Sequence, residues 1–197
     1  MESKQSVVNR LIEEHGGLIF TKYITDAGIS RDYLPQMARS GCLKRLGRGA
    51  YLAEGCYDDT MYRLQFKHGR AVFSHDTALF LHDLSDLEPL VPSVTVPSGY
   101  NARRLKEFPA SVFFVSRELY QIGMTARVTA FGNSIACYDA ERAICDAVRS
   151  RSKTDIAIIT DAIKRYSTGK KNIPKLMKYA EKFRVAKLIR PYLEVLL

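Results

Sequence analysis

The sequence has no apolar run long enough to cross a membrane, and we expect no leader of the secretory type. No stretch approaches 18 uninterrupted apolar residues, and residues 1–17 show helical periodicity with acidic residues instead of an uncharged apolar core. We therefore expect a cytoplasmic protein without a membrane partner. A length of 197 residues allows one large domain or two small ones, each with a buried core.

The four cysteines lack the spacing of a metal or redox site. Cys42, Cys56, Cys137 and Cys145 form no C-x-x-C pair, and none has a histidine at zinc-finger spacing. Zinc requires clustered ligands, so we expect no metal site. In a reducing compartment these cysteines are interpreted as small core residues.

Enzymatic signatures are also missing. The glycine patterns of phosphate-binding loops and dinucleotide sites are absent. The clustered acids between residues 58 and 88 lack the lysine, two positions beyond an acid, that metal-dependent nucleases often use. His75-Asp76 would need a positioned partner for acid–base catalysis, so a structural role is favoured. We expect neither enzymatic activity nor a cofactor; a metal-dependent nucleic-acid enzyme remains as an alternative.

Positive charge is in excess and is unevenly distributed. The formal net charge is +9. Residues 1–146 hold 17 basic and 17 acidic residues, whereas residues 147–197 hold 13 basic and 4 acidic residues. Such a basic region favours a polyanion or an acidic protein surface as partner, although solubility alone also explains it.

Residues 4–53 show a recognisable order of predicted elements, and residues 29–53 within them are rich in basic residues. Helical periodicity at residues 4–14 is followed by a second helix, a turn at Gly28, and a third helix that Ser30 is expected to cap. Strands at Cys42–Leu46 and Ala50–Ala53 follow, joined by Gly47-Arg48-Gly49. Three helices and a hairpin in this order predict a winged helix-turn-helix.

The charges of this segment fall where such a fold meets DNA. Gln36 and Arg39 lie opposite the apolar stripe of the third helix, and the hairpin carries the remaining bases. The candidate DNA-binding residues are Arg31, Gln36, Arg39, Lys44, Arg45 and Arg48. Pro35, placed one turn into the helix, is expected to weaken or bend it. The alternative is an ordinary solvated helix and hairpin.

The second half predicts an α+β unit. The proline-rich segment at residues 87–99 indicates a boundary, so we expect a DNA-binding domain at 1–88 and a second domain at 89–197. Strands are expected at Ser93–Val96, Ser111–Ser116, Ala126–Phe131 and Ser134–Tyr138, and helices at Ala140–Arg149, Asp155–Tyr166, Lys175–Phe183 and Ala186–Leu197. Asp139, Glu141, Arg142 and Asp146 fit cap and ion-pair positions at the start of the first of these helices.

Residues 17–53 resemble the amino-terminal domain of the AbiEi antitoxins of bacterial abortive-infection (type IV toxin–antitoxin) systems. The resemblance rests on the run Gly41–Tyr51, with its Gly-Arg-Gly core, and continues through Phe73–Leu79, Leu84–Pro89 and Asp139–Asp146. It implies a first domain that binds inverted repeats in its own promoter as an autorepressor. It implies a second domain that counters a cognate nucleotidyltransferase toxin, with or without a stable complex, and so serves phage resistance.

The carboxy-terminal bases supply a candidate antitoxin surface. Lys175, Lys178 and Lys182 are spaced to form one exposed stripe of a helix, and Lys164 and Arg165 add a further basic pair. Antitoxicity, extra grip on DNA and a merely solvated face are the three interpretations left open. For the whole chain, the runner-up is a stand-alone winged-helix regulator whose second half dimerises or senses a ligand.

Overall fold

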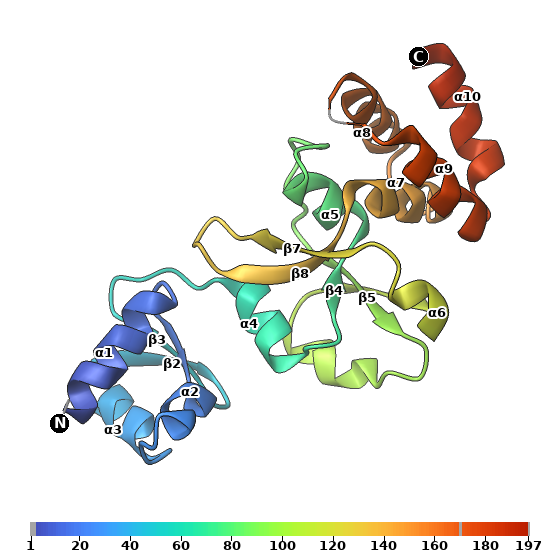
Figure 1. The fold of residues 1–197 in the computed structure, drawn as a ribbon. Coiled ribbons are helices and arrows are strands. Elements are labelled where there is room, and N and C mark those ends of the chain that lie inside the picture. Colours follow the sequence, from blue (N-terminus) through green and yellow to red (C-terminus); the bar gives the residue numbers. More distant parts are fainter. Residues whose placement is uncertain (1–2, 170, 197) are drawn as a thin grey trace. The chain divides into compact units, whose positions relative to one another are not determined.

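The protein is a mixed α and β chain that divides into two compact units. The computed structural model describes residues 3–169 and 171–196. The first unit comprises the described part of Met1–Arg63 together with Val128–Ser134, and the second comprises Leu64–Arg127 and the described part of Ile135–Leu197. The chain therefore passes between the units three times. Figure 1 shows the course of the chain through both units.

The first unit consists of three helices and a small antiparallel sheet. Its elements are α1 (Lys4–Glu14), β1 (Leu18–Phe20), α2 (Thr21–Asp26), α3 (Tyr33–Arg39), β2 (Leu43–Gly47) and β3 (Ala50–Ala53). The strand order is β1-β3-β2, with Leu18 opposite Leu52 on one side and Lys44 opposite Leu52 on the other. The helices and the hairpin thus lie within a few residues of their expected positions.

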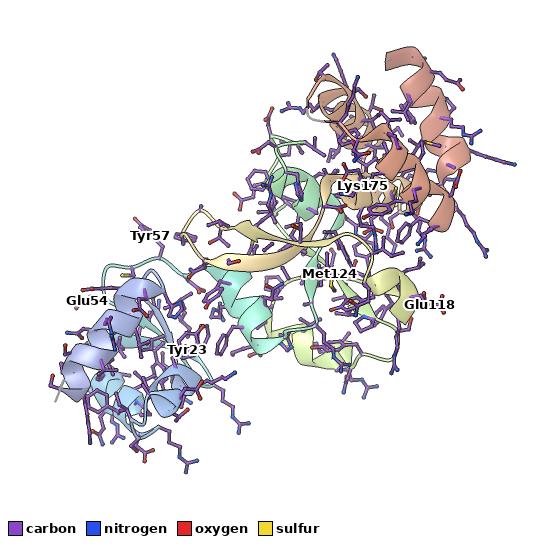
Figure 2. The ribbon with its side chains drawn as sticks, viewed as in Figure 1. Tyr23, Glu54, Tyr57, Glu118, Met124 and Lys175 are labelled. Carbon is purple, nitrogen blue, oxygen red and sulfur yellow. The ribbon has the colours of Figure 1, made fainter. Side chains whose placement is uncertain are left out.

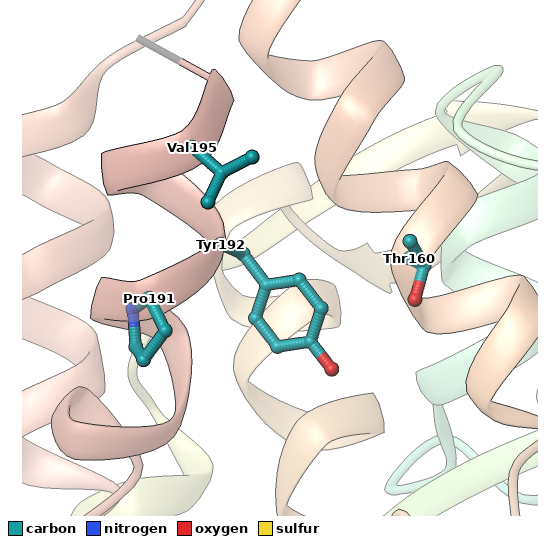
Figure 3. A pocket seen from close by; sticks show the side chains of 4 residues that line it. All are labelled: Thr160, Pro191, Tyr192 and Val195. Atoms are coloured by element: carbon teal, nitrogen blue, oxygen red, sulfur yellow. The ribbon is translucent and has the colours of Figure 1, made fainter.

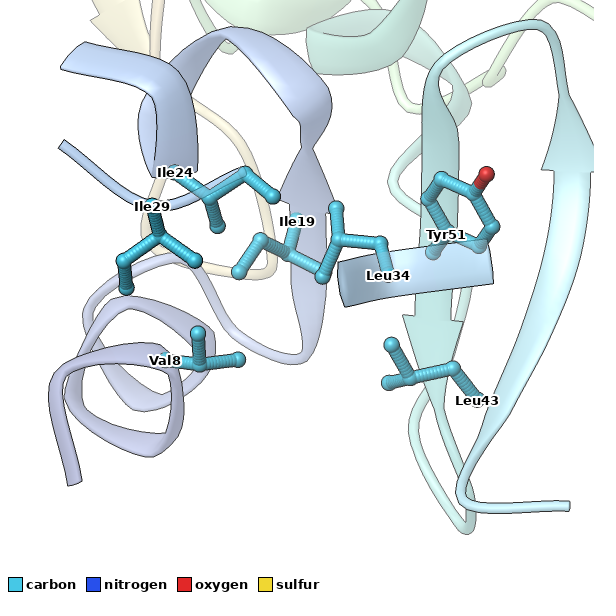
Figure 4. Packing of buried hydrophobic residues seen from close by; sticks show 7 residues of the cluster. All are labelled: Val8, Ile19, Ile24, Ile29, Leu34, Leu43 and Tyr51. Carbon is cyan, nitrogen blue, oxygen red and sulfur yellow. The ribbon is translucent and has the colours of Figure 1, made fainter. Parts of the chain in front are cut away.

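The core of the first unit contains a residue from each of these elements, together with Ile29 from the turn between α2 and α3. The core residues are Val8, Ile19, Ile24, Ile29, Leu34, Leu43 and Tyr51 (Figure 4). Leu34 is fully buried, and it fixes α3 to the sheet side of the unit. Truncation of a buried leucine to alanine typically costs about 2–5 kcal/mol. Because Leu34 faces the core, the opposite face of α3 is turned to solvent.

Two turns of the first unit require glycine. Gly28, between α2 and α3, has φ +75°, and Gly49, in the β2–β3 turn, has φ +69°. Residues with a side chain rarely adopt this left-handed conformation. The prediction that Gly28 supplies the left-handed residue between the two helices is confirmed.

The start of α3 differs from the prediction. Ser30 does not cap the helix; it lies in a turn in which its carbonyl accepts the Tyr33 N–H at 3.0 Å, and Asp32 takes the N-cap position without a side-chain hydrogen bond. Pro35 is therefore the third helical residue. The first four N–H groups of a helix have no intrahelical acceptor, so a proline there removes no hydrogen bond. The expected weakening of α3 by Pro35 is thus wrong.

The segment Val128–Ser134 is attached to the first unit by one buried carboxylate. Asp59 is 2% exposed, and its Oδ2 accepts hydrogen bonds from Asn133 Nδ2 at 2.9 Å and from the Thr129 hydroxyl. Residues this far apart in the sequence give no local pattern that predicts such a contact.

The second unit is built on a five-stranded sheet. Its strands, in the order β6-β5-β4-β8-β7, are β6 (Ser111–Val115), β5 (Ser93–Pro97), β4 (Val72–Phe73), β8 (Ser134–Tyr138) and β7 (Met124–Val128). β4 pairs antiparallel with β5 and parallel with β8. Residue 88, expected to end the first domain, therefore lies inside this unit. The sequence did not indicate β4, because a strand of two residues is too short to show periodicity.

Helices surround this sheet. They are α4 (Thr60–Lys67), which begins in the first unit, α5 (His75–Leu81), a 3₁₀ segment (Ala102–Glu107), α6 (Arg117–Tyr120), α7 (Ala140–Arg149), α8 (Ile156–Thr168), α9 (Ile173–Lys182) and α10 (Ala186–Leu196). α7 packs against α5, α8 and α9, and α10 packs against α8 and α9 (Figure 1).

A fully buried arginine joins several of these elements. Arg142 Nη1 donates to the carbonyls of Leu119 at 2.6 Å and Ile122 at 2.9 Å, and its Nε lies 2.9 Å from Asp146 Oδ1. Its guanidinium also lies over the rings of Tyr138 and Phe183. The predicted ion pair with Asp146 is confirmed, as is the cap, because Asp139 Oδ1 accepts the Arg142 N–H.

Candidate nucleic-acid interface

The outer face of α3 carries two of the predicted contact residues. Leu34 is buried, and Met37 and Ala38 pack against the core, so the opposite face of the helix is exposed. Gln36 and Arg39 are both exposed there, three residues apart and therefore neighbours on the helix surface.

The hairpin after α3 carries three more. Lys44 and Arg45 are exposed on β2, which packs against α3, and Arg48 is exposed in the turn to β3. The register shifts between Arg45 and Gly47, where the Arg45 Nε donates to the Gly47 carbonyl at 3.4 Å. A bulge of this kind bends a strand and increases its local twist. Arg31 is also exposed, in the turn that precedes α3.

The bases of this region form no ion pair with a carboxylate within the part of the chain that the structure describes. They are Arg31, Arg39, Lys44, Arg45 and Arg48. Asp32 is the only acid among residues 29–53. Five positive charges on α3, on β2 and in the turns beside them therefore remain available for an anionic partner such as phosphate.

The candidate antitoxin residues divide into paired and free cations. Arg165 pairs with Asp161 at 2.7 Å and with Asp86, and Lys175 Nζ lies 3.0 Å from both Asp139 and Glu141. The expected uniform stripe of exposed lysines on α9 is therefore wrong in one respect, because Lys175 is engaged with the start of α7. Lys164, Lys178 and Lys182 are exposed and, within the described residues, have no such pair.

The ion pairs of Lys175 also affect the neighbouring carboxyl group. Burial acts to raise the pKa of Glu141, but hydrogen bonds from Lys175, its own backbone and Tyr166 lower it overall. The Lys175 ammonium thus stabilises the junction of α7 and α9. Figure 2 shows Lys175 in its place among these helices.

His75 is buried, and both of its ring nitrogens are hydrogen-bonded. Nδ1 lies 2.9 Å from Ser74 Oγ and Nε2 lies 3.1 Å from Ser150 Oγ, while the ring stacks on Phe113. Burial, and then the cations of Arg142, Arg149 and Lys153, lower its pKa to about 3. His75 is therefore neutral at pH 7, and the structure gives it the structural contacts that the sequence favoured.

An apolar groove in the second unit had no clear sequence signal. It has a volume of about 290 Å³ and is lined by Thr160 of α8 and by Pro191, Tyr192 and Val195 of α10 (Figure 3). Val195 is 85% exposed, which is unusual for an aliphatic residue beside a groove. In the sequence, the sign of this groove is a valine on the exposed side of an amphipathic helix.

The remaining features are the lengths of the helices, the grouping of metal-binding side chains and the burial of the cysteines. No helix within the described residues is both long and apolar enough to span a bilayer. In the same part of the chain, no three His, Cys, Asp or Glu side chains come together in a way that could hold a metal ion. Cys137 and Cys145 are buried, as expected, whereas Cys42 and Cys56 are exposed, so the interpretation of all four as core residues is half wrong.

The fold and the basic surface define a two-unit α+β protein with a candidate anion-binding face. No protein-family model matches the chain, and no curated protein matches it in sequence. Among solved structures, the crystal structure of the Rv2827c protein from Mycobacterium tuberculosis is similar, with a TM-score of 0.62 over 92% of this chain and 72% of that chain. At 14% identity, the similarity concerns the fold alone.

Proposed function

We propose that this chain is a sequence-specific DNA-binding repressor that also acts as an antitoxin. The observation that carries the proposal is the exposed face of α3 beside a basic hairpin, with five cations that form no ion pair within the described residues. The order α1-β1-α2-α3-β2-β3 around a three-stranded sheet supports a winged helix-turn-helix in which α3 is the recognition helix.

In this proposal α3 reads bases and the hairpin holds phosphates. Arginine pairs bidentately with guanine and glutamine with adenine in the major groove, which assigns sequence readout to Arg39 and Gln36. Arg48, at the tip of the hairpin, contacts a phosphate or the adjacent minor groove, and Lys44 and Arg45 contact the neighbouring backbone. Because α3 begins at Tyr33, Pro35 lies in its first turn and removes no intrahelical hydrogen bond.

The test of DNA binding uses the promoter region upstream of the chain's own gene in a gel shift. Arg39→Ala is expected to weaken binding to this DNA and to spare binding to random DNA, and Arg48→Ala is expected to weaken both alike. Lys4→Ala, which removes an exposed lysine of α1, is the matched control and leaves both affinities unchanged. Equal affinities for all four proteins would overturn the proposal.

The antitoxin part of the proposal rests on the resemblance to AbiEi proteins and on the free lysines of the second unit. Lys164 and Lys178 lie on α8 and α9, and both are exposed without an acidic partner within the described residues. A Lys164→Glu/Lys178→Glu variant is expected to lose protection against a co-expressed nucleotidyltransferase toxin while it still represses its promoter. Unchanged protection would remove this surface from the antitoxin function, and lost repression would assign it to DNA.

The apolar groove between α8 and α10 favours one second candidate, a winged-helix regulator that dimerises through its second unit. A contact of exposed Val195 and half-buried Tyr192 with a second copy would bury apolar area that is open in the single chain. Tyr192→Arg would then convert a dimer to a monomer in sedimentation velocity. A monomer in both proteins would eliminate this candidate.

A further inference from the structure

The second unit contains a polar pocket that differs in character from the apolar groove. The pocket has a volume of about 310 Å³ and lies where α6 meets the carboxyl ends of α7 and α9. Its charged lining residues are Arg149, Lys182, Arg184 and Glu118, and Figure 2 shows Glu118 on α6. Ser116 adds a hydroxyl group at the start of α6. This volume is at the lower end of the range of small-molecule sites, which runs from about 300 to 1,000 Å³.

The charge of the pocket suits a doubly charged anion. Three cations and one carboxylate give the lining a net charge of two positive units. A phosphate monoester carries up to two negative charges near neutral pH, so it would balance this charge. Within the described residues, the structure gives no ion pair to Arg149, Lys182 or Arg184. Three uncompensated cations around one hollow repel one another, and a bound anion removes that repulsion.

The backbone of Arg184 adopts a conformation that favours glycine over a residue with a side chain. Arg184 follows α9 with φ +59°, and the Val185 N–H bonds to the Ala180 carbonyl at 2.8 Å while the Arg184 N–H bonds to the Glu181 carbonyl at 3.1 Å. This is a helix-ending motif in which the left-handed position is usually glycine. Helix dipoles account for cations at the ends of α7 and α9, but they do not account for a long side chain in a left-handed conformation.

The walls of the pocket are held in place by the buried arginine described above. Arg142 binds the Leu119 carbonyl on the α6 side and lies 3.9 Å from the centre of the Phe183 ring on the α9 side. Leu119 and Phe183 both line the pocket. A fully buried arginine that contacts both walls helps to hold them in position, and such preorganisation reduces the cost of ordering the pocket around a ligand.

We propose that this pocket is a binding site for a small phosphorylated ligand, whose phosphoryl group is held by Arg149, Lys182 and Arg184. The guanidinium groups suit bidentate contacts to phosphoryl oxygens, and the lysine adds a point charge. Glu118 and Ser116 then accept or donate hydrogen bonds at the part of the ligand that carries no phosphate. The proposal goes beyond DNA repression and antitoxicity, and it depends on neither.

The experiment measures thermal unfolding and calorimetric binding of the full chain with three probes, inorganic phosphate, pyrophosphate and adenosine monophosphate. Binding of any of these to the folded protein raises Tm in a saturable manner. A response to adenosine monophosphate stronger than that to phosphate identifies a nucleotide, and a response strongest with pyrophosphate identifies a diphosphate group. Each of these results supports the proposal.

Arg184→Gly is the decisive variant. It removes one cation and places glycine at a left-handed position, so the ligand-free protein is expected to unfold at the same or a higher temperature while affinity for the probe falls at least tenfold. Lys178→Ala is the matched control on α9, where the side chain lies outside the pocket lining. It is expected to bind the probe like the parent protein.

Three results would overturn the proposal. The first is a parent protein whose unfolding responds to none of the probes. The second is an equal loss of affinity in Arg184→Gly and Lys178→Ala, which would show that the probe senses overall charge. The third is a duplex DNA of arbitrary sequence that binds in an Arg184-dependent manner when no small probe does, which would make this surface a contact for the DNA backbone.

Discussion

The two units distribute positive charge differently. Residues 147–197 hold all of the excess charge of the chain. Among their described cations, Arg165 and Lys175 form ion pairs, whereas Lys164, Lys178 and Lys182 are exposed without one. The bases of residues 29–53 lie in the part of the chain whose formal charge is zero, and they form no ion pair within the described residues. Net charge alone therefore does not identify the surface that an anionic partner would contact.

The largest expected effect concerns a paired charge in the second unit. Arg142→Met leaves Asp146 buried without its partner, and breaking a buried ion pair in this way costs about 3–5 kcal/mol of unfolding free energy. Chemical denaturation of the full chain measures the loss. Arg165→Met, which removes an exposed arginine from a surface ion pair, is the control and is expected to change stability far less. Similar losses in the two variants would contradict the assignment of Arg142 as the link between α6, α7 and α9.

The next effect concerns the free charges of the first unit. Arg39→Ala and Gln36→Ala are each expected to cost about 1–3 kcal/mol of binding free energy on the true operator and little on random DNA. Fluorescence anisotropy with both DNAs measures the difference. A loss of equal size on random DNA would show that the two residues contact phosphates. The assignment of base readout to α3 and of backbone contact to the hairpin would then be wrong.

A pH-dependent effect, gradual over several pH units, is expected in the second unit. The pKa of His75 is about 3 in the folded protein because the ring is buried beside cations, and it is about 6.5 in an unfolded chain. The stability that neutral His75 contributes is present above pH 6.5 and is lost as pH falls toward 3. The unfolding free energy should therefore decrease by up to about 1.4 kcal/mol per pH unit below pH 6.

The control for this pH dependence is His75→Asn, since asparagine tolerates the positive φ of residue 75 and cannot take up a proton. Denaturation of the variant between pH 7 and pH 4.5 is expected to show a slope reduced by about one proton. An unchanged slope would mean that other groups account for the acid sensitivity.

Local patterns were sufficient for most of the first unit. Apolar spacing predicts α1 and α3, Gly28 predicts the turn between α2 and α3, and Gly47-Arg48-Gly49 predicts the hairpin. The six candidate DNA-binding residues are all exposed, and for Gln36 and Arg39 helical periodicity had predicted it. The start of α3 was misplaced because a serine in a turn and a serine at a helix cap have the same local sequence.

The second unit depends more on contacts between distant residues, and its prediction was correspondingly weaker. β4 is two residues long and α6 is four, so neither has enough residues to show a period. The pairing of Lys175 with Asp139 and Glu141 depends on how α9 packs on α7, which no spacing within α9 reveals. The pocket around Arg184 was missed for the same reason, because its lining residues come from three separate segments.

The most direct test of the central claim is the salt dependence of DNA binding by two variants that each lose three positive charges. One variant changes Lys44, Arg45 and Arg48 to alanine, and the other changes Lys164, Lys178 and Lys187, which are exposed in the second unit. The slope of log affinity against log salt falls by about one for each phosphate contact that is lost. We expect a decrease of about three in the first variant and no change in the second. The reverse result, a smaller slope only in the second variant, would place the DNA contact in the second unit and contradict the account.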